Sequence, residues 1–247
     1  NFGASDTFEI NDLINKIKSN ISKKTILVIM SQIYPGFTEK INWDQNRLFY
    51  QVETLIFGEA LRRAKNPERL IIGINNPNIK INSYYKKYLE AFNAPILKMN
   101  YQSAELCKIS INMLLISNIS ISNYLSNICE KIDADWASIV QALRLDKRIG
   151  KHSYISPGLG LSGGNLERDL VSLNQISNKY KINKQLLDAY RNISQLNKNW
   201  ISKILQKVTK KNKKLKITLF GIAYKEDTNS IKNAQSFFLL KKHKDLL

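Results

Sequence analysis

The sequence predicts an α/β fold with an all-helical middle region, and three observations support this prediction. Residues 1–99 alternate between helical and strand periodicity, which is typical of a parallel sheet covered by helices. From residue 103 onward, apolar residues recur on nearly every helical face. A strand-like run then begins at Lys216. We therefore expect three regions, 1–99, 100–210 and 215–247: the end of a parallel-sheet domain, a helical central domain and the start of a second α/β domain.

Within the first region, the strongest strand prediction is the run Thr25–Met30, because a continuous β-branched and apolar segment fits a strand buried on both faces. Tyr34-Pro35-Gly36 then predicts a turn. The full expected set is helix Asp12–Ser22, strand Thr25–Met30, helix Asn46–Ala64, strand Leu70–Gly73, a tyrosine-rich helix and strand Pro95–Lys98.

The central region is expected to be built on one long helix, Ser103–Lys131, buried on most sides. Serines and asparagines interrupt its most apolar stretch, Ile109–Ile121, so we do not expect a membrane span. The remaining expected elements are helices Trp136–Leu143, Leu166–Lys179 and Lys184–Thr209, a basic linker at Lys210–Lys214 and a strand at Lys216–Gly221.

Composition limits the function classes without choosing one. The formal net charge of +18 permits nucleic-acid binding. However, we find no zinc-finger spacing and no basic stripe interleaved with stacking aromatics, so a solvated basic surface is the simpler interpretation. The two cysteines, Cys107 and Cys129, make no disulfide framework, and residues 1–10 lack the pattern of a signal peptide. We expect a cytoplasmic protein that holds no metal.

The string Gly158-Leu-Gly160-Leu-Ser-Gly163 has the spacing of a dinucleotide-binding fingerprint. That fingerprint works only where a strand precedes it and a helix N-terminus receives the pyrophosphate. Here Ser153–Pro157 precedes it, and Pro157 is unsuited to a central strand. The string is better interpreted as a loop, poor in side chains, whose backbone can close on a ligand.

Three polar residues suggest acid–base chemistry. Lys108 and Asn112 are four residues apart and project from one face of the long helix. A lysine on a buried helix needs a partner or a ligand, although a lone lysine more often extends to solvent. Asp169 falls in the first turns of the helix after the glycine string, where a carboxylate also favours the helix dipole. A lysine and an aspartate across a dry pocket can hold a proton near neutral pH, as general acid–base catalysis requires.

Four segments follow one another in an order and spacing that resemble the central domain of the UDP-glucose/GDP-mannose dehydrogenase family. They are Ala104–Asn112, Cys129–Asp135, Asp146–Gly150 and Pro157–Asp169. The flanking segments agree with this resemblance. Ser31–Gly36 resembles the turn that closes the family's N-terminal domain, Asn66–Arg69 with Gly73 resembles its next strand entry, and Phe220–Thr228 resembles the opening of its C-terminal domain.

The resemblance implies an architecture and an activity. It implies the C-terminal half of a Rossmann-like NAD-binding domain, a helical domain in the style of 6-phosphogluconate dehydrogenase that forms a homodimer through the long helix, and the start of a UDP-binding domain. The implied activity is NAD-dependent oxidation of a UDP- or GDP-hexose at the C6 CH–OH group, for surface polysaccharide biosynthesis. Relatives with the fold of 3-hydroxyacid or 6-phosphogluconate dehydrogenases would not need the glycine loop followed by Asp169.

The resemblance also implies roles for individual residues. It places Lys108, Asn112 and Asp169 at the reacting carbon. Glu53 matches a family glutamate, a further acid–base group, although one polar residue on an amphipathic helix explains it equally well. Arg148 matches an arginine that reaches the nucleotide sugar, often across a dimer interface; its alternative role is that of a helix C-terminal cation. The other implied contacts are Tyr154, Gly158, Gly160, Gly163 and Lys225 with the substrate, and Ser31 and Lys232 with NAD.

The departures from the family pattern bear most directly on mechanism. The family's four-electron reaction traps an aldehyde on a cysteine, and Asn165 stands at that position. An amide nitrogen is not a nucleophile, so no thiohemiacetal can form. Cys107 does not replace the thiol, because neighbouring helical residues point in different directions. In addition, Phe57 stands at a common glutamate, Arg168 at a lysine and Lys232 at an arginine.

Several interpretations stay open on the sequence alone. The protein performs a single two-electron step, or it reaches the acid through a hydrated aldehyde with water held by Asn165 and Asp169, or it binds a nucleotide sugar without turnover. A basic nucleic-acid-binding protein is the alternative from another class. The family's dinucleotide fingerprint is expected upstream of residue 1, so the chain reads as a fragment, and neither the sugar nor the nucleotide is specified.

Overall fold

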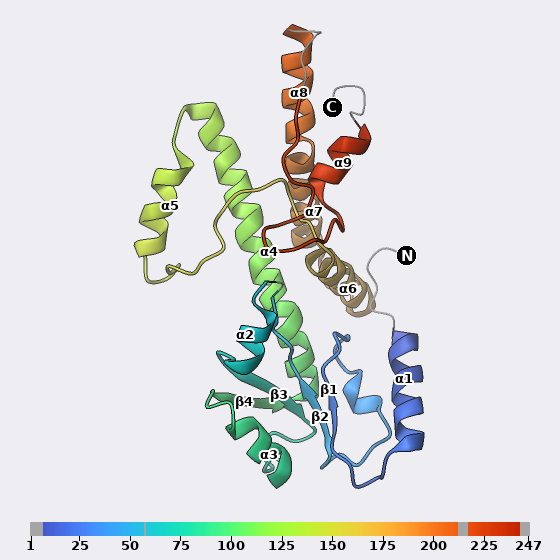
Figure 1. The fold of residues 1–247 in the computed structure, drawn as a ribbon. Helices are drawn as coiled ribbons and strands as arrows, with labels where there is room; N and C mark the ends of the chain where they lie inside the picture. Colours follow the sequence, from blue (N-terminus) through green and yellow to red (C-terminus); the bar gives the residue numbers. More distant parts are fainter. Residues whose placement is uncertain (1–6, 57, 212–216, 243–247) are drawn as a thin grey trace. The chain divides into compact units, whose positions relative to one another are not determined.

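The computed structural model describes residues 7–56, 58–211 and 217–242, and Phe57 lies outside these ranges. Contacts divide the chain into two compact units, residues 3–111 and residues 112–247 (Figure 1). The long helix α4 (Tyr101–Ile132) contributes its first turns to unit 1 and the remainder to unit 2.

Unit 1 is a four-stranded sheet with helices on both faces. Its elements are α1 (Thr7–Asn20), β1 (Leu27–Ile29), a short 3₁₀ helix (Thr38–Lys40), β2 (Leu48–Gln51), α2 (Ala60–Lys65), β3 (Leu70–Ile74), α3 (Ser83–Glu90) and β4 (Ile96–Asn100). The strand order is β1-β2-β3-β4. The α/β class is thus as predicted, but the sheet is mixed: β1–β2 and β3–β4 run parallel, whereas β2–β3 run antiparallel.

The two faces of this sheet are covered by different helices, as the twofold periodicity of strands requires. On one face, Leu27 and Tyr50 pack with Ile14 of α1 and with Tyr101 and Ala104 of α4. The other face is packed by Phe49, Leu70 and Ile72 against Tyr85 and Leu89 of α3.

The prediction of a helix at Asn46–Ala64 is wrong. The segment instead forms β2, a loop and the short helix α2. All four β2 residues are buried, and an apolar run this short cannot be told from a buried helical segment by periodicity. Hydrogen bonding to two neighbouring strands decides the outcome, because β2 pairs with both β1 and β3.

Unit 2 is helical, as expected. It contains the remainder of α4, α5 (Trp136–Leu145), α6 (Asn165–Tyr180), α7 (Gln185–Lys198), α8 (Trp200–Lys211) and α9 (Gln235–Lys242). Its core packs Ile116 of α4 against Leu161, Leu170 of α6 and Leu187 of α7. The expected single helix Lys184–Thr209 is two helices that meet at Asn199, a weak helix former.

The strand expected at Lys216–Gly221 is not formed. Lys216 lies outside the described residues, and residues 217–221 have no regular secondary structure. A strand needs a partner for its backbone groups, and the described part of unit 2 contains no other strand.

Helix α4 is long and apolar enough to cross a membrane by length and composition, which the interrupted apolar run did not lead us to expect. The core helices of soluble proteins meet the same criterion. The polar residues of α4 behave as core residues do, since Asn112 and Asn123 are buried and hydrogen-bonded to other segments of unit 2.

Candidate functional site

A buried polar pair joins α4 to α6. Asn112 Nδ2 donates a hydrogen bond to Asp169 Oδ2 over 2.5 Å, and the two residues are 7% and 0% exposed. A buried carboxylate is tolerated only when it is hydrogen-bonded, so the contact fixes both side chains. Lys108 lies one turn before Asn112 on the same helix and is half-buried.

The glycine string forms a loop that is held by α4 and α7. The Gly158 N–H donates to Asn123 Oδ1 over 2.7 Å, and the Leu161 N–H donates to Ser194 Oγ over 2.9 Å. Gly160 has a φ of +87°, and a Cβ there would lie 2.5 Å from the Ser194 carbonyl oxygen. Only glycine fits this position. No strand precedes the loop within residues 151–157, so the dinucleotide-fingerprint interpretation fails.

The segment that precedes α9 lies against the end of this loop. The Gly163 N–H donates to the Lys232 carbonyl oxygen over 3.2 Å, and Asn233 Nδ2 donates to the Gly163 carbonyl oxygen over 2.8 Å. The Lys232 side chain packs over Gly164, and the Tyr224 ring packs over Gly163. Residues 224–233 and the glycine loop therefore form one surface.

A polar cluster that the sequence analysis missed fastens the first turn of α6. Glu167 pairs with Lys198 of α7 over 2.7 Å and accepts a second hydrogen bond from Asn233. Both side chains of the ion pair are largely shielded from solvent. In the sequence, Glu167 is simply a glutamate in the first turn of a predicted helix. The helix dipole favours a carboxylate at that position, so nothing in the sequence indicated an ion-pair partner.

Asn165 begins α6 and is exposed. Its Oδ1 accepts a hydrogen bond from the Arg168 guanidinium over 3.0 Å. Asn165 and Asp169 are four residues apart on α6 and therefore lie on one side of that helix.

A hollow of about 610 Å³ borders the loop. Gly158, Leu159, Gly160 and Ser162 form one wall, and the segment from Leu219 to Glu226, including Lys225, contributes another. Burial raises the pKa of the Tyr224 hydroxyl, and nearby Tyr154 raises it further. The hollow thus combines one cation, Lys225, and one carboxylate, Glu226, with aromatic groups and a backbone surface; the lysine and the rings suit a ligand that has an anionic group and a ring.

The other expected site residues lie elsewhere. Arg148 follows α5, is 88% exposed at its side chain and pairs with Asp146 over 2.6 Å; hydrogen bonds from Arg148 lower the pKa of the Asp146 carboxyl. Tyr154 is exposed. In unit 1, Ser31 is exposed just beyond β1. Glu53 lies in the loop after β2, not on the expected helix, and accepts a hydrogen bond from the Leu55 N–H.

Unit 1 also holds a buried carboxylate that the sequence analysis did not single out. Glu105 of α4 is 0% exposed and accepts hydrogen bonds from the backbone N–H groups of Gly36 and Thr38 over 2.5 and 2.8 Å. Burial raises the pKa of this carboxyl, and hydrogen bonds from Thr38, Gly36 and Phe37 oppose the rise. The turn after β1 is thereby anchored to α4. The long sequence separation left no local signal for this contact.

The described residues do not build a pyrophosphate site for NAD. The glycine loop lacks a preceding strand, and Lys232 folds over Gly164. Ser31 is the one expected NAD contact at a favourable place, because ligands of α/β sheets bind beyond the carboxyl ends of strands. The described residues also contain no cluster of three metal-ligating side chains.

The fold is that of nucleotide-sugar dehydrogenases, an α/β unit followed by a helical central unit. A UDP-D-ManNAc dehydrogenase from Pyrococcus horikoshii aligns with a TM-score of 0.84 at 18% identity over 100% of this chain and 62% of that one. A UDP-glucose dehydrogenase from Pyrobaculum islandicum aligns with a TM-score of 0.76 at 22% identity over 89% of this chain and 52% of that one.

Sequence comparisons match the central part of the chain to one protein family. Residues 102–196 match the model of the UDP-glucose/GDP-mannose dehydrogenase family, central domain. UDP-glucose 6-dehydrogenase TuaD of Bacillus subtilis is 27% identical over 235 residues, which are 94% of this chain and 50% of the relative. The UDP-glucose 6-dehydrogenase of Rickettsia typhi is 26% identical over 239 residues, 93% of this chain and 55% of the relative.

Residues 102–196 of this chain are therefore similar to the central domain of the UDP-glucose/GDP-mannose dehydrogenase family. The chain spans about half the length of the curated relatives it matches.

Proposed function

We propose that the chain is the central part of an NAD-dependent dehydrogenase that oxidises a nucleotide sugar at its C6 alcohol, in the cytoplasm, for surface polysaccharide biosynthesis. The observation that supports this most strongly is the buried hydrogen bond between Asn112 of α4 and Asp169, which follows the glycine loop; both residues lie inside the stretch that matches the family's central domain. The named relatives act on UDP-glucose, which agrees with the proposal.

The reacting centre is assigned to Lys108, Asn112 and Asp169. When bound, NAD supplies a hydride acceptor for C6. The hydroxyl proton must leave as the C–H bond breaks, and the half-buried Lys108 is assigned as the group that accepts it. Asn112 and Asp169 hold each other in place and orient the sugar oxygen. Glu53 is assigned a further acid–base role, and Ser31 and Lys232 are assigned to NAD.

The nucleotide is assigned to the 610 Å³ hollow. Lys225 supplies a cation for the diphosphate, and the backbone of Gly158 and Gly160 supplies a close surface for the sugar. Gly163 is assigned to the substrate from the resemblance, although it is buried under the Tyr224 ring. Tyr154 lies near Tyr224 at this surface. The guanidinium of Arg148 is exposed, so in a dimer it could reach the site of a partner subunit.

Asn165 limits the reaction to one two-electron step. Without a thiol no covalent intermediate forms, and the Asn165 side-chain oxygen already accepts a hydrogen bond from Arg168. The first oxidation removes a hydride from C6 and a proton from its oxygen, which leaves an aldehyde. A second oxidation would require the aldehyde hydrate to lose another hydride and proton, with water held by Asn165 and Asp169; this route is the alternative.

The protein is proposed to form a homodimer through α4. Leu114, Ile121, Ile128 and Ile132 are exposed at spacings that place them on one face of this helix, and Tyr124 lies beside them. An apolar stripe of this kind is typical of a surface that another chain covers.

Titration of the chain with UDP and UDP-glucose tests the substrate assignment. We expect saturable binding of both, weakened about tenfold in Lys225→Ala, because a charge-assisted contact contributes about 1.5–3 kcal/mol. Lys147→Ala, a change of an exposed lysine after α5, is the matched control and should bind as the parent does.

The same titration distinguishes two alternative functions from the proposed one. Binding of UDP-glucose without NADH formation by the full-length gene product would favour a catalytically silent homologue, for which Asn165 is the argument. Failure to bind any nucleotide sugar, together with DNA affinity that falls steeply with salt, would favour a nucleic-acid-binding protein, for which the +18 charge is the argument.

A further inference from the structure

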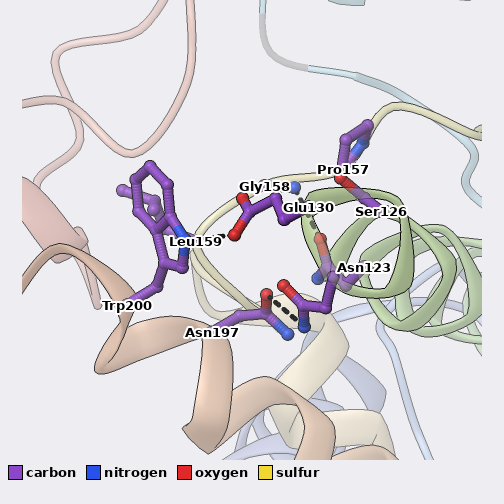
Figure 2. Close-up of a pocket in the computed structure, with 9 residues that line it drawn as sticks. Asn123, Ser126, Glu130, Pro157, Gly158, Leu159, Asn197 and Trp200 are labelled. Carbon is purple, nitrogen blue, oxygen red and sulfur yellow. Dashed lines mark hydrogen bonds between the residues drawn. The ribbon is translucent and has the colours of Figure 1, made fainter. Parts of the chain in front are cut away.

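The glycine loop separates two hollows. Gly158 and Leu159, which line the large hollow, also line a second hollow of about 230 Å³. The second hollow lies between the loop, α4 and the junction of α7 with α8 (Figure 2). The Asn112–Asp169 pair is not among its lining residues.

One polar face of α4 forms a wall of the second hollow. Asn123, Ser126, Asn127 and Glu130 follow one another at spacings of three, one and three residues, which places them on one side of the helix. Asn123 is buried, Ser126 and Asn127 are half-buried and Glu130 is exposed, so this wall is a polar surface open to solvent on one side. Polar groups placed in this way can orient a ligand.

The opposite wall holds these side chains in position. Trp200 Nε1 donates to Glu130 Oε2 over 3.3 Å (Figure 2). Asn127 Nδ2 donates a weak hydrogen bond to Asn197 Oδ1 over 3.4 Å. Asn197 is itself held by a hydrogen bond to the Ile193 carbonyl oxygen over 2.9 Å. The wall is therefore pre-organised, which lowers the cost of binding.

Asn123 joins this wall to the glycine loop. The residue is 2% exposed, and its Oδ1 accepts the Gly158 N–H over 2.7 Å. No hydrogen bond of its Nδ2 group is found within the described part of the chain, and this group is not among the buried polar atoms that lack a partner. It therefore keeps access to solvent, and an amide of this kind can donate to a ligand there.

The lining defines the class of ligand. Amide, hydroxyl and carboxylate groups offer donors and acceptors together, and sugar hydroxyls need both. The Trp200 indole adds a flat apolar surface for the carbon face of a sugar ring. The described lining residues include no cation and one carboxylate, which disfavours anions. The volume is below the roughly 300 Å³ of typical small-molecule sites, which suits a ligand the size of one sugar ring.

We propose that this hollow binds a neutral monosaccharide or cyclic polyol, at a site separate from the one that takes the nucleotide sugar. The proposal does not depend on turnover. Because Gly158 and Leu159 belong to both hollows, a bound sugar stiffens one wall of the nucleotide site.

Nuclear magnetic resonance of the tryptophan indole N–H groups tests the proposal. The chain has three tryptophans, and Trp200→Phe identifies the signal of interest. The probes are D-glucose, N-acetylglucosamine and myo-inositol as neutral ligands, putrescine as a cation and inorganic phosphate as an anion. We expect at least one neutral probe to shift the Trp200 signal saturably, and neither charged probe to do so.

Variants show whether the shift reports this hollow. We expect Asn127→Leu to weaken binding of the neutral probe about tenfold. The milder change Ser126→Ala should weaken this binding less, in proportion to the hydrogen bonds lost. Asn118→Leu, on the opposite side of α4, should leave the affinity unchanged. A shift that survives Asn127→Leu and Ser126→Ala, a response to putrescine alone, or no response to any probe would each overturn the proposal.

Discussion

At the scale of single residues, the site depends on buried polar groups that hold one another. Asn112 and Asp169 come from different helices and meet in the core of unit 2. Both residues lie on the helices that the sequence predicted for them, and the i,i+4 spacing of Lys108 and Asn112 predicted a shared face. The ion pair between Glu167 and Lys198 could not be predicted in this way, since it depends on how α6 and α7 pack.

Replacement of Asn112 by leucine should lower the free energy of unfolding by about 1.5–3 kcal/mol, the usual contribution of a hydrogen bond to a charged group. The side chains are similar in size, so the loss reports the contact with the Asp169 carboxylate and not a cavity. Urea denaturation measures the change. Asn118→Leu on the same helix serves as the control and should stay within about 0.5 kcal/mol. Equal stability of the two variants would contradict the assignment.

At the scale of elements, the sequence specified long helices better than short strands. The predictions for α4, α5 and α6 were correct to within two residues at each end, because apolar residues recur at helical spacing from one turn to the next in each of them. The strand β2 was missed because four buried residues carry no period, and only pairing with β1 and β3 makes them a strand. The strand expected near Gly221 failed for the opposite reason, since it has no partner in the described part of unit 2.

Replacement by alanine should change the stability of the protein differently at two glycines of the same loop. At Gly160, φ is +87° and a Cβ would meet the Ser194 carbonyl oxygen, so Gly160→Ala should destabilise by about 2 kcal/mol or more. At Gly158 nothing lies within 4 Å of an added Cβ, so Gly158→Ala should cost less than about 1 kcal/mol. Thermal denaturation of both variants checks the difference. A Gly160→Ala protein as stable as Gly158→Ala would show that the loop is not packed on α7.

The buried Glu105 predicts a pH dependence of stability. Its folded pKa is raised above the usual 4.5, mainly by burial, so the folded chain binds this proton more tightly than the unfolded chain does. Protonated Glu105 therefore stabilises the folded chain. This stabilisation is fully present below the pKa that the carboxyl has in the unfolded chain, and it is lost as the pH rises through the higher pKa of the folded chain. The unfolding free energy of the parent should therefore fall over this window relative to that of Glu105→Gln, as denaturation at a series of pH values would measure. Parallel pH profiles would refute a raised pKa.

At the scale of the whole molecule, exposed apolar surface and charge set the association behaviour. The apolar stripe of α4 predicts a dimer, whereas the net charge of +18 opposes self-association at low salt. Added salt screens the repulsion between protomers and should therefore strengthen the dimer.

The double variant Leu114→Lys/Ile121→Lys should be monomeric where the parent is dimeric, because it places two charges in the proposed interface. Sedimentation at several salt concentrations measures the mass. Leu145→Lys, at an 85% exposed residue that ends α5, is the control and should leave the dimer intact. If the parent protein is monomeric at all concentrations, the proposal that α4 forms a dimer interface is wrong.

The most direct test of the proposed function is the number of NADH molecules formed per nucleotide sugar consumed by the full-length gene product, compared with its Asn165→Cys variant. UDP-glucose, UDP-N-acetylhexosamines and GDP-mannose are the substrates to compare. We predict one NADH and an aldehyde product for the parent, and a second NADH once a thiol stands at position 165. Two NADH from the parent would show that the acid is reached without a thiol. No NADH from any sugar, with binding retained, would contradict the assignment as a dehydrogenase.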